Sequence, residues 1–115
     1  MPIEERFISF DLDEVYKAVN IICERDDLKK PPAGKLLSIE LDEADSKRQG
    51  DDVIHLNVRK RDDGEEENLK FMRKFFAEAL IFYCQGSGIP LPRRGQKILA
   101  VMEDKIVMKV VVKDE

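Results

Sequence analysis

Residues 71–97 constrain the fold of this chain more than any other stretch. In the first half, FMRKFFAEALIFYCQ, apolar side chains recur at helical spacing so densely that they cover more than half of the circumference. A helix on the protein surface needs a narrower apolar stripe. The spacing therefore predicts a helix from about Met72 to Gln85 that lies across a sheet. Gly86 follows at the expected C′ position, because a residue without Cβ adopts a left-handed conformation at low cost.

A second helix is predicted directly after Asp11. The sequence Asp11-Leu-Asp-Glu14 has the form of a capping box, in which each acidic side chain accepts a hydrogen bond from the backbone N–H of the other residue. Apolar residues recur at helical spacing from Leu12 to Cys23. The segment KKPPAG at residues 29–34 ends this helix, because proline lacks a backbone donor and pushes the preceding residue out of the helical region.

Several other segments alternate apolar with polar residues or are dense in β-branched residues, as is typical of strands. They cover residues 6–10, 37–41, 54–58, 98–102 and 106–112, with Leu37, Ile39 and Leu41 predicted on one face of the second. The last of them is expected to lie inside its sheet, because one face is wholly apolar. Residues 42–52 contain almost nothing apolar beyond Ala44 and are predicted to form a long exposed hairpin loop.

Residues 61–68 allow two interpretations. As a helix start, Asp63 would be the N-cap and three glutamates would lie near the positive end of the helix dipole. As a hairpin, Asp63-Gly64 would form a type I′ turn. The hairpin is favoured because its register matches residues of opposite charge and of apolar character. It places Arg61 opposite Glu66, Lys60 opposite Glu67, Val58 opposite Leu69 and Leu56 opposite Phe71.

The predicted element order is therefore β-α-β-β-β-α-β-β. Antiparallel hairpins dominate this order, and two amphipathic helices are available to cover one face. The expected fold is an α+β two-layer sandwich, with a mainly antiparallel sheet of about six strands and two helices packed on one face. A chain of 115 residues forms one domain, residues 1–115, and buries enough surface without disulfides or metal.

Composition narrows the class of protein. Charged residues make up 38% of the chain, but both signs are mixed and the net charge is −4, which argues against a wholly basic protein that coats nucleic acid. Cys23 and Cys84 lie among apolar neighbours without a CxxC motif and are expected to be buried, reduced thiols. With no charged-then-apolar leader and no run of 18 apolar residues, a cytoplasmic protein without a membrane partner is expected.

The strongest candidate binding site is the loop that follows the apolar helix. Its predicted binding residues are Pro90, Pro92, Arg93, Arg94 and Lys97. The two prolines favour an extended polyproline conformation, and the three cations would bind a phosphate or an acidic protein segment. A structural interpretation stands beside it: the cations bind carbonyls at the C-terminus of the helix or the acidic loops, while Ile89 and Leu91 fill the edge of the core.

A nucleic-acid-binding protein is the alternative. It would use Arg93, Arg94, Lys97 and the Arg59–Arg61 cluster to contact phosphates. Basic residues interleaved with acidic ones, and no exposed aromatic ladder for base stacking, argue against it. The glycines of Gly86-Ser-Gly88 follow a helix instead of preceding one, so they do not form a phosphate loop.

No catalytic residue, metal site or cofactor site is predicted. The single histidine, His55, lies on the polar side of its strand, and the sequence specifies no nucleophile beside it. The acidic runs lack the spacing of a calcium loop. The chain is therefore predicted to be a non-catalytic binding or regulatory module that presents loop 89–97 to an acidic protein partner. A large pocket containing His55 or a carboxylate pair would favour an enzyme, and the sheet edges also allow a homodimer.

Overall fold

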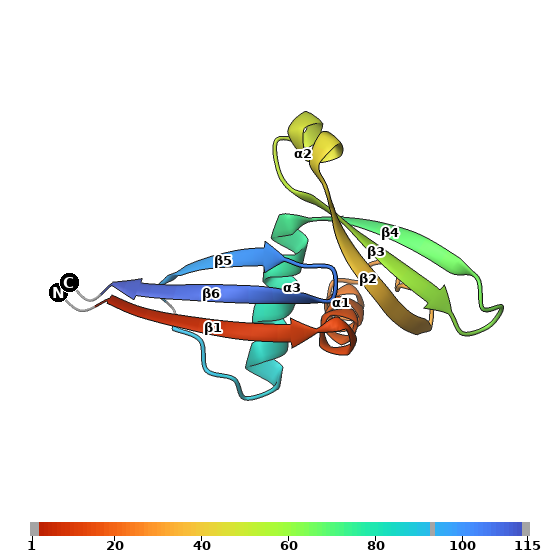
Figure 1. Cartoon of the computed structure of the whole chain (residues 1–115). Helices are drawn as coiled ribbons and strands as arrows, with labels where there is room; N and C mark the ends of the chain where they lie inside the picture. Colours follow the sequence, from red (N-terminus) through yellow and green to blue (C-terminus); the bar gives the residue numbers. More distant parts are fainter. Residues whose placement is uncertain (1–2, 93, 114–115) are drawn as a thin grey trace.

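The computed structural model describes residues 3–92 and 94–113 and confirms the predicted α+β class (Figure 1). Six strands and three helices are present in this part of the chain. In order they are β1 (Ile3–Asp11), α1 (Leu12–Arg25), β2 (Gly34–Asp42), α2 (Glu43–Gln49), β3 (Val53–Lys60), β4 (Glu66–Met72), α3 (Arg73–Gly86), β5 (Gln96–Val101) and β6 (Lys105–Lys113).

The strands form two sheets instead of the single six-stranded sheet predicted. Each sheet has three antiparallel strands, in the orders β1-β6-β5 and β2-β3-β4. The two sheets lie at opposite ends of the molecule in Figure 1, with α1 between them. They meet where the backbone N–H of Ile39 donates to the carbonyl of Glu103 at 2.9 Å. Local hairpins account for β2-β3-β4 and β5-β6, whereas β1 pairs with a strand about one hundred residues away, which local patterns do not reveal.

One hydrophobic core joins the two sheets. Helix α1 contacts α3 and also β1, β2 and β6, while α3 also contacts β4. Strand β6 is central, as predicted, and its Met108 is as completely buried as Leu56 of β3. Cys23 and Cys84 are free and buried in this core, and burial raises the pKa of both thiols. Helices and sheets therefore belong to one compact domain, and none of the helices in the described part is long and apolar enough to cross a membrane.

The predicted start of α1 is confirmed in detail. Glu14 N–H donates to the Asp11 carboxylate at 2.9 Å, and Asp11 N–H donates to the Glu14 carboxylate at 3.1 Å. This capping box satisfies backbone donors that the first helical turn leaves unpaired. The strand before the helix ends with Phe10 buried, whereas Phe7 is exposed.

Residues 42–52 do not form the long loop that was predicted, because they contain helix α2. Asp42 caps this helix by accepting from the N–H of Asp45 at 2.9 Å, and Gly50 ends it with a φ of +73°. Acidic residues occupy the first turn, and Lys47 and Arg48 occupy the last. Caps and charges that match the helix dipole thus stabilise a seven-residue helix that has no apolar face.

The β3-β4 hairpin is present, but the predicted register is wrong by two residues. Leu56 pairs with Leu69 instead of Phe71, and Ile54 pairs with Phe71. The turn is longer than a type I′ turn, because Gly64 N–H donates to the Lys60 carbonyl at 3.0 Å. A shift of two residues keeps every side chain on its predicted face, so Leu69 and Phe71 still have apolar partners. Val58 pairs with Glu67 instead, and Glu66 pairs with Arg59 in place of the predicted Arg61.

Two smaller corrections concern β2 and the end of α3. A register irregularity between Leu36 and Ser38 takes Leu37 off the face of Ile39, and Leu36 is buried in its place. Leu41 lies on the same face as Ile39 but is 42% exposed. Gly86 is still helical, and the left-handed residue is instead Gly88, with a φ of +74°. Ile89 N–H then donates to the Cys84 carbonyl at 2.9 Å, as in a Schellman motif, and the chain turns away from the helix.

Candidate functional site

The structure places most of the predicted binding loop between α3 and β5. Pro90 and Arg94 are exposed, while Pro92 and Lys97 are half-buried. Arg93 lies outside the described residues. Among the four predicted residues that the structure describes, Pro90 and Arg94 are therefore the ones most open to solvent.

The backbone of this loop is fixed by side chains at both ends. Arg6 Nη1 on β1 donates to the carbonyl of Pro90 at 3.0 Å. Lys97 Nζ donates to the carbonyl of Pro92 at 3.2 Å and lies 3.5 Å from that of Gly95. Ile89 and Leu91 pack against the core. Lys97 thus binds carbonyls of the loop itself, and not the helix-terminal carbonyls or acidic loops that the structural interpretation of the sequence expected. Arg94 remains as the exposed cation in the described part of the loop.

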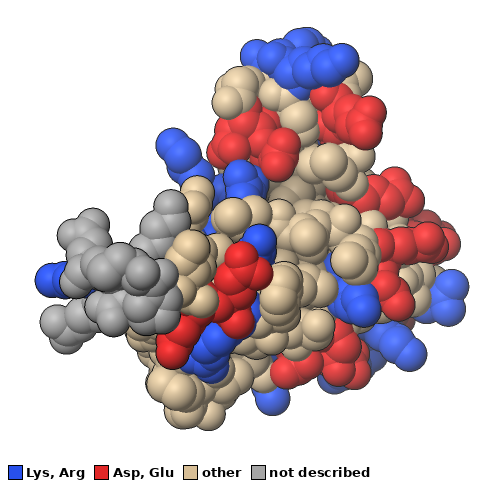
Figure 2. All heavy atoms as spheres, turned by 60° about the vertical axis from the view of Figure 1, so that its left-hand side comes forward, with Lys and Arg blue, Asp and Glu red and all other residues tan. Residues whose placement is uncertain are grey.

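The second basic cluster, Arg59–Arg61, lies far from this loop. It ends β3, at the opposite end of a molecule that is 55 Å long from the start of β5 (Figure 1). Within the cluster, Lys60 Nζ is 3.1 Å from the carboxylate of Asp63 and stabilises the turn. Figure 2 shows basic and acidic side chains interspersed over the visible face. The two clusters do not merge into one basic surface.

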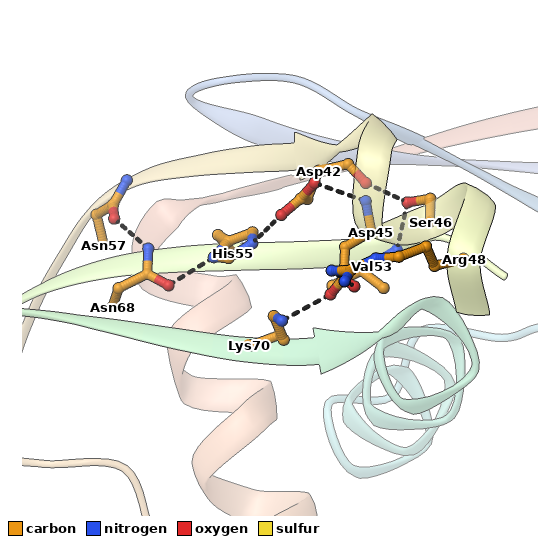
Figure 3. Close-up of polar contacts among 9 residues, drawn as sticks. All are labelled: Asp42, Asp45, Ser46, Arg48, Val53, His55, Asn57, Asn68 and Lys70. Carbon is orange, nitrogen blue, oxygen red and sulfur yellow. Dashed lines mark hydrogen bonds and ion pairs between the residues drawn. The ribbon is translucent and has the colours of Figure 1, made fainter.

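A network of polar side chains covers the outer face of the β2-β3-β4 sheet (Figure 3). The sequence analysis did not predict this network. His55 Nε2 on β3 lies 2.9 Å from the carboxylate of Asp42, and Nδ1 lies 2.5 Å from the side-chain oxygen of Asn68 on β4. The Asn68 amide donates to the Asn57 oxygen at 2.7 Å, and the Asn57 amide donates to Ser38 Oγ at 2.8 Å. One continuous chain of hydrogen bonds therefore crosses β2, β3 and β4.

The network favours the charged form of His55. Both ring nitrogens face oxygen acceptors, so both donate when the imidazole is protonated. The hydrogen bond to Asn68, followed by that to Asp42, raises the pKa of His55. The N–H of Asp45, followed by His55, lowers the pKa of Asp42. When the imidazole is protonated, His55 and Asp42 therefore form an ion pair that joins neighbouring strands.

Asp45 joins α2 to the same sheet. Its side chain is nearly fully buried, and its two oxygens lie 2.5 Å from Arg48 Nη2 and 2.6 Å from Lys70 Nζ. Lys70, followed by Arg48, lowers the pKa of Asp45. A buried carboxylate needs such partners, because an unpaired charge away from water is costly. Asp45 thus fixes the orientation of α2.

A wide, open hollow of about 610 Å³ contains His55, which is the feature that would favour an enzyme. Glu40, Leu41, Asp42, Glu43 and Asn68 line it with His55. However, both nitrogens of His55 are engaged with Asp42 and Asn68. Ser46 Oγ donates to the Asp42 carbonyl at 2.5 Å and accepts from Val53 N–H at 2.8 Å. A general base needs a ring nitrogen that can reach a substrate, and in this structure both ring nitrogens have protein partners.

The outer face of the β1-β6-β5 sheet has the opposite character. Phe7, Lys109 and Ile98 form a row across its three strands, and the flanking rows bring Val107 and Val111 to the same face. Phe7 is 65% exposed and Ile98 is 37% exposed. We call this surface the open face. Its β5 strand begins two residues after Arg94, so the open face continues from the binding loop.

In residues 3–92 and 94–113, no three His, Cys, Asp or Glu side chains gather closely enough to hold a metal ion. Comparisons of the chain with protein-family models, with curated proteins and with solved structures gave no match.

Proposed function

We propose that this protein is a non-catalytic binding or regulatory module that holds an acidic segment of a partner protein at the loop Ile89–Lys97. The observation that carries this proposal is the way the loop is held. Arg6 and Lys97 bind its backbone carbonyls, while Pro90 and Arg94 remain exposed. A loop fixed before binding loses less conformational entropy when a partner arrives.

Arg94 supplies the charge for recognition, and Lys97 positions it. A guanidinium group binds a carboxylate through two parallel hydrogen bonds, which gives both affinity and orientation. The Lys97 ammonium instead binds the carbonyls of Pro92 and Gly95. We expect Lys97 to act through the shape of the loop and not by contact with the partner.

The other polar cluster supports a role without catalysis. His55 and Ser46 form hydrogen bonds that stabilise the sheet and α2, so the groups most suited to acid–base or nucleophilic chemistry have structural partners. The free thiols of Cys23 and Cys84 support a cytoplasmic location, because reducing compartments keep cysteines unpaired.

Affinity capture from nuclease-treated cell extract tests the proposal with two matched variants. Arg94→Glu reverses a charge in the loop, and Arg59→Glu makes the same change at an exposed site at the other end of the molecule. We expect proteins captured by the wild type to be lost with Arg94→Glu and retained with Arg59→Glu. Equal retention by both variants would refute the loop as the binding site.

A parallel capture without nuclease separates the two classes of partner. Nucleic acid that is retained by the wild type, and lost with either arginine variant, would contradict a protein-binding role. Such binding would also weaken steeply with added salt, since phosphate contacts release counterions.

A further inference from the structure

The open face carries large apolar side chains that are exposed to solvent. Ile3 is 60% exposed and Phe7 65% exposed on β1, and Met102, which follows β5, is 44% exposed. Helices α1 and α3 lie on the opposite side of this sheet in Figure 1. On this face Phe7, Ile98, Val107 and Val111 surround Lys109, whereas Glu5 separates Ile3 from Phe7 along β1. A cluster of apolar side chains at the surface of a folded domain marks a site of interaction.

The cation Lys109 lies near the centre of this face, and Lys105 lies on the same face nearer the β5-β6 turn. Lys109 is flanked across the sheet by Phe7 and Ile98. Its ammonium lies 5.9 Å from the centre of the Phe7 ring and 3.6 Å from the carboxylate of Glu5. That second distance is longer than a charge-assisted hydrogen bond of about 2.7–2.9 Å, and an ammonium has three donors. The Lys109 ammonium can therefore donate a hydrogen bond to a second carboxylate.

The dimensions of the open face fit one helix. Nine-residue strands extend about 30 Å, and three strands about 4.8 Å apart make a surface roughly 14 Å wide. A helix is about 10–12 Å in diameter, and about 20 residues span 30 Å. One helix laid along the strands would cover the Phe7, Val111 and Ile98 side chains together.

We propose that the open face docks an amphipathic helix of a partner protein, with the apolar side of the helix on Phe7, Val111 and Ile98 and an acidic side chain at Lys109. This inference rests on the proposed function, because it gives the acidic partner of the loop a second contact surface. The loop and the open face are continuous at the start of β5, so one acidic, amphipathic segment reaches both Arg94 and Lys109.

A second copy of the chain fits this surface less well. A two-fold axis through the centre of the face would place β6 against its own copy, because β6 is the middle strand. The two Lys109 ammonium groups would then face each other across an apolar interface. Like charges in such a position oppose association.

Synthetic peptides test the proposal with the intact protein. The probe is an amphipathic peptide of about 20 residues with leucine on one side and glutamate on the other. Its controls are the same peptide with lysine for glutamate and a scrambled peptide of equal composition. Titration is followed by NMR of isotope-labelled methyl groups, in which Ile98, Val107 and Val111 report on the open face and Leu56 reports on the core.

We expect the acidic peptide to shift the open-face methyl signals and to leave that of Leu56 unchanged. Phe7→Gln should weaken its binding about tenfold through loss of an apolar anchor, and Lys109→Gln about threefold through loss of a partly exposed charge. Leu28→Gln is the matched control, since Leu28 is 50% exposed and lies outside the face. Neither substitution on the face removes a core side chain, so both variants should fold.

Three results would overturn the proposal. In the first, the scrambled peptide binds as tightly as the acidic one. In the second, the shifts fall outside the open face. In the third, the wild type self-associates through the open face in a way that Phe7→Gln abolishes. Arg94→Glu in the same titration separates the two proposals. Binding that depends on Phe7 but not on Arg94 supports the open face and refutes the loop, and the reverse dependence refutes the open face alone.

Discussion

The two sheets share one core and one antiparallel design, yet their outer faces differ in chemistry. On β2-β3-β4, the side chains of Ser38, Asn57 and Asn68 form a row and hydrogen-bond to one another. The hydrogen bonds continue from Asn68 to His55 and Asp42. On β1-β6-β5, the corresponding central row is Phe7, Lys109 and Ile98, in which Phe7 is 65% exposed and Ile98 is 37% exposed. The polar side chains of the first face are hydrogen-bonded to one another, whereas the second face exposes apolar side chains to solvent.

This difference shows why the histidine is a poor guide to function here. A histidine, a carboxylate and an open hollow occur together, which often indicates an active site. In this structure the hydrogen bonds of these groups join three strands and cap α2. The face with exposed apolar side chains, on β1-β6-β5, is the one without such a polar network.

The largest expected effect tests what the two sheets share. Leu56→Ala and Met108→Ala each remove a fully buried side chain from a different sheet. Each should lower the free energy of unfolding by about 2–5 kcal/mol, measured by urea denaturation. A value near zero for either variant would mean that its sheet does not contribute to the common core.

Asn57→Ala should have a smaller effect that is confined to the polar face. It removes the link between Ser38 and Asn68, so both lose a hydrogen-bond partner. We expect a loss of about 1 kcal/mol in unfolding free energy, because these groups are partly accessible to water. Unchanged stability in urea denaturation would mean that the side-chain network contributes nothing.

The polar face should also make stability depend on pH. Asn68 and Asp42 raise the folded-state pKa of His55 above the ordinary value of 6.5. The stabilisation is therefore fully present below about pH 6.5 and is lost as pH rises through the folded-state pKa. The stability difference between wild type and His55→Gln should be larger at acidic than at alkaline pH.

Chemical denaturation of both proteins on either side of neutrality measures this difference. The lower pKa of Asp42 acts in the other direction at more acidic pH, because that carboxylate stabilises only while ionised. A His55→Gln difference that grows with rising pH would contradict the ion pair.

The smallest expected effect belongs to the open face. Phe7→Gln should change the unfolding free energy by less than about 0.5 kcal/mol, since Phe7 is 65% exposed. Phe10→Ala, three residues later on the same strand, removes a core side chain and should cost about 3–5 kcal/mol. Comparable losses of unfolding free energy for the two variants would show that Phe7 stabilises the fold, which would contradict its role as a partner contact.

The sequence was sufficient wherever the structure is determined by local spacing. The capping box at Asp11, the apolar faces of α1 and α3, and the interior strand β6 follow from periodicity. Helix α2 was missed because it has no apolar stripe. Its signals were Asp42 before the helix and Gly50 after it, together with charges that match the dipole.

Other features depend on distant pairing and could not be predicted from local patterns. The side-chain network requires Asp42, His55 and Asn68 to meet diagonally across three strands, and it depends on a hairpin register that was predicted two residues away. Arg6 reaches Pro90 only because β1 pairs with β6. The candidate loop was found from composition, but the structural role of Lys97 was not distinguishable from a binding role.

The most direct test compares the two outer faces in one capture experiment. Phe7→Gln changes the open face, and Glu40→Gln changes an exposed residue beside His55 on the polar face. We predict that protein partners retained by the wild type in nuclease-treated extract are lost with Phe7→Gln and kept with Glu40→Gln. Loss with Glu40→Gln and retention with Phe7→Gln would contradict the account, because it would assign binding to the face whose polar groups are already paired.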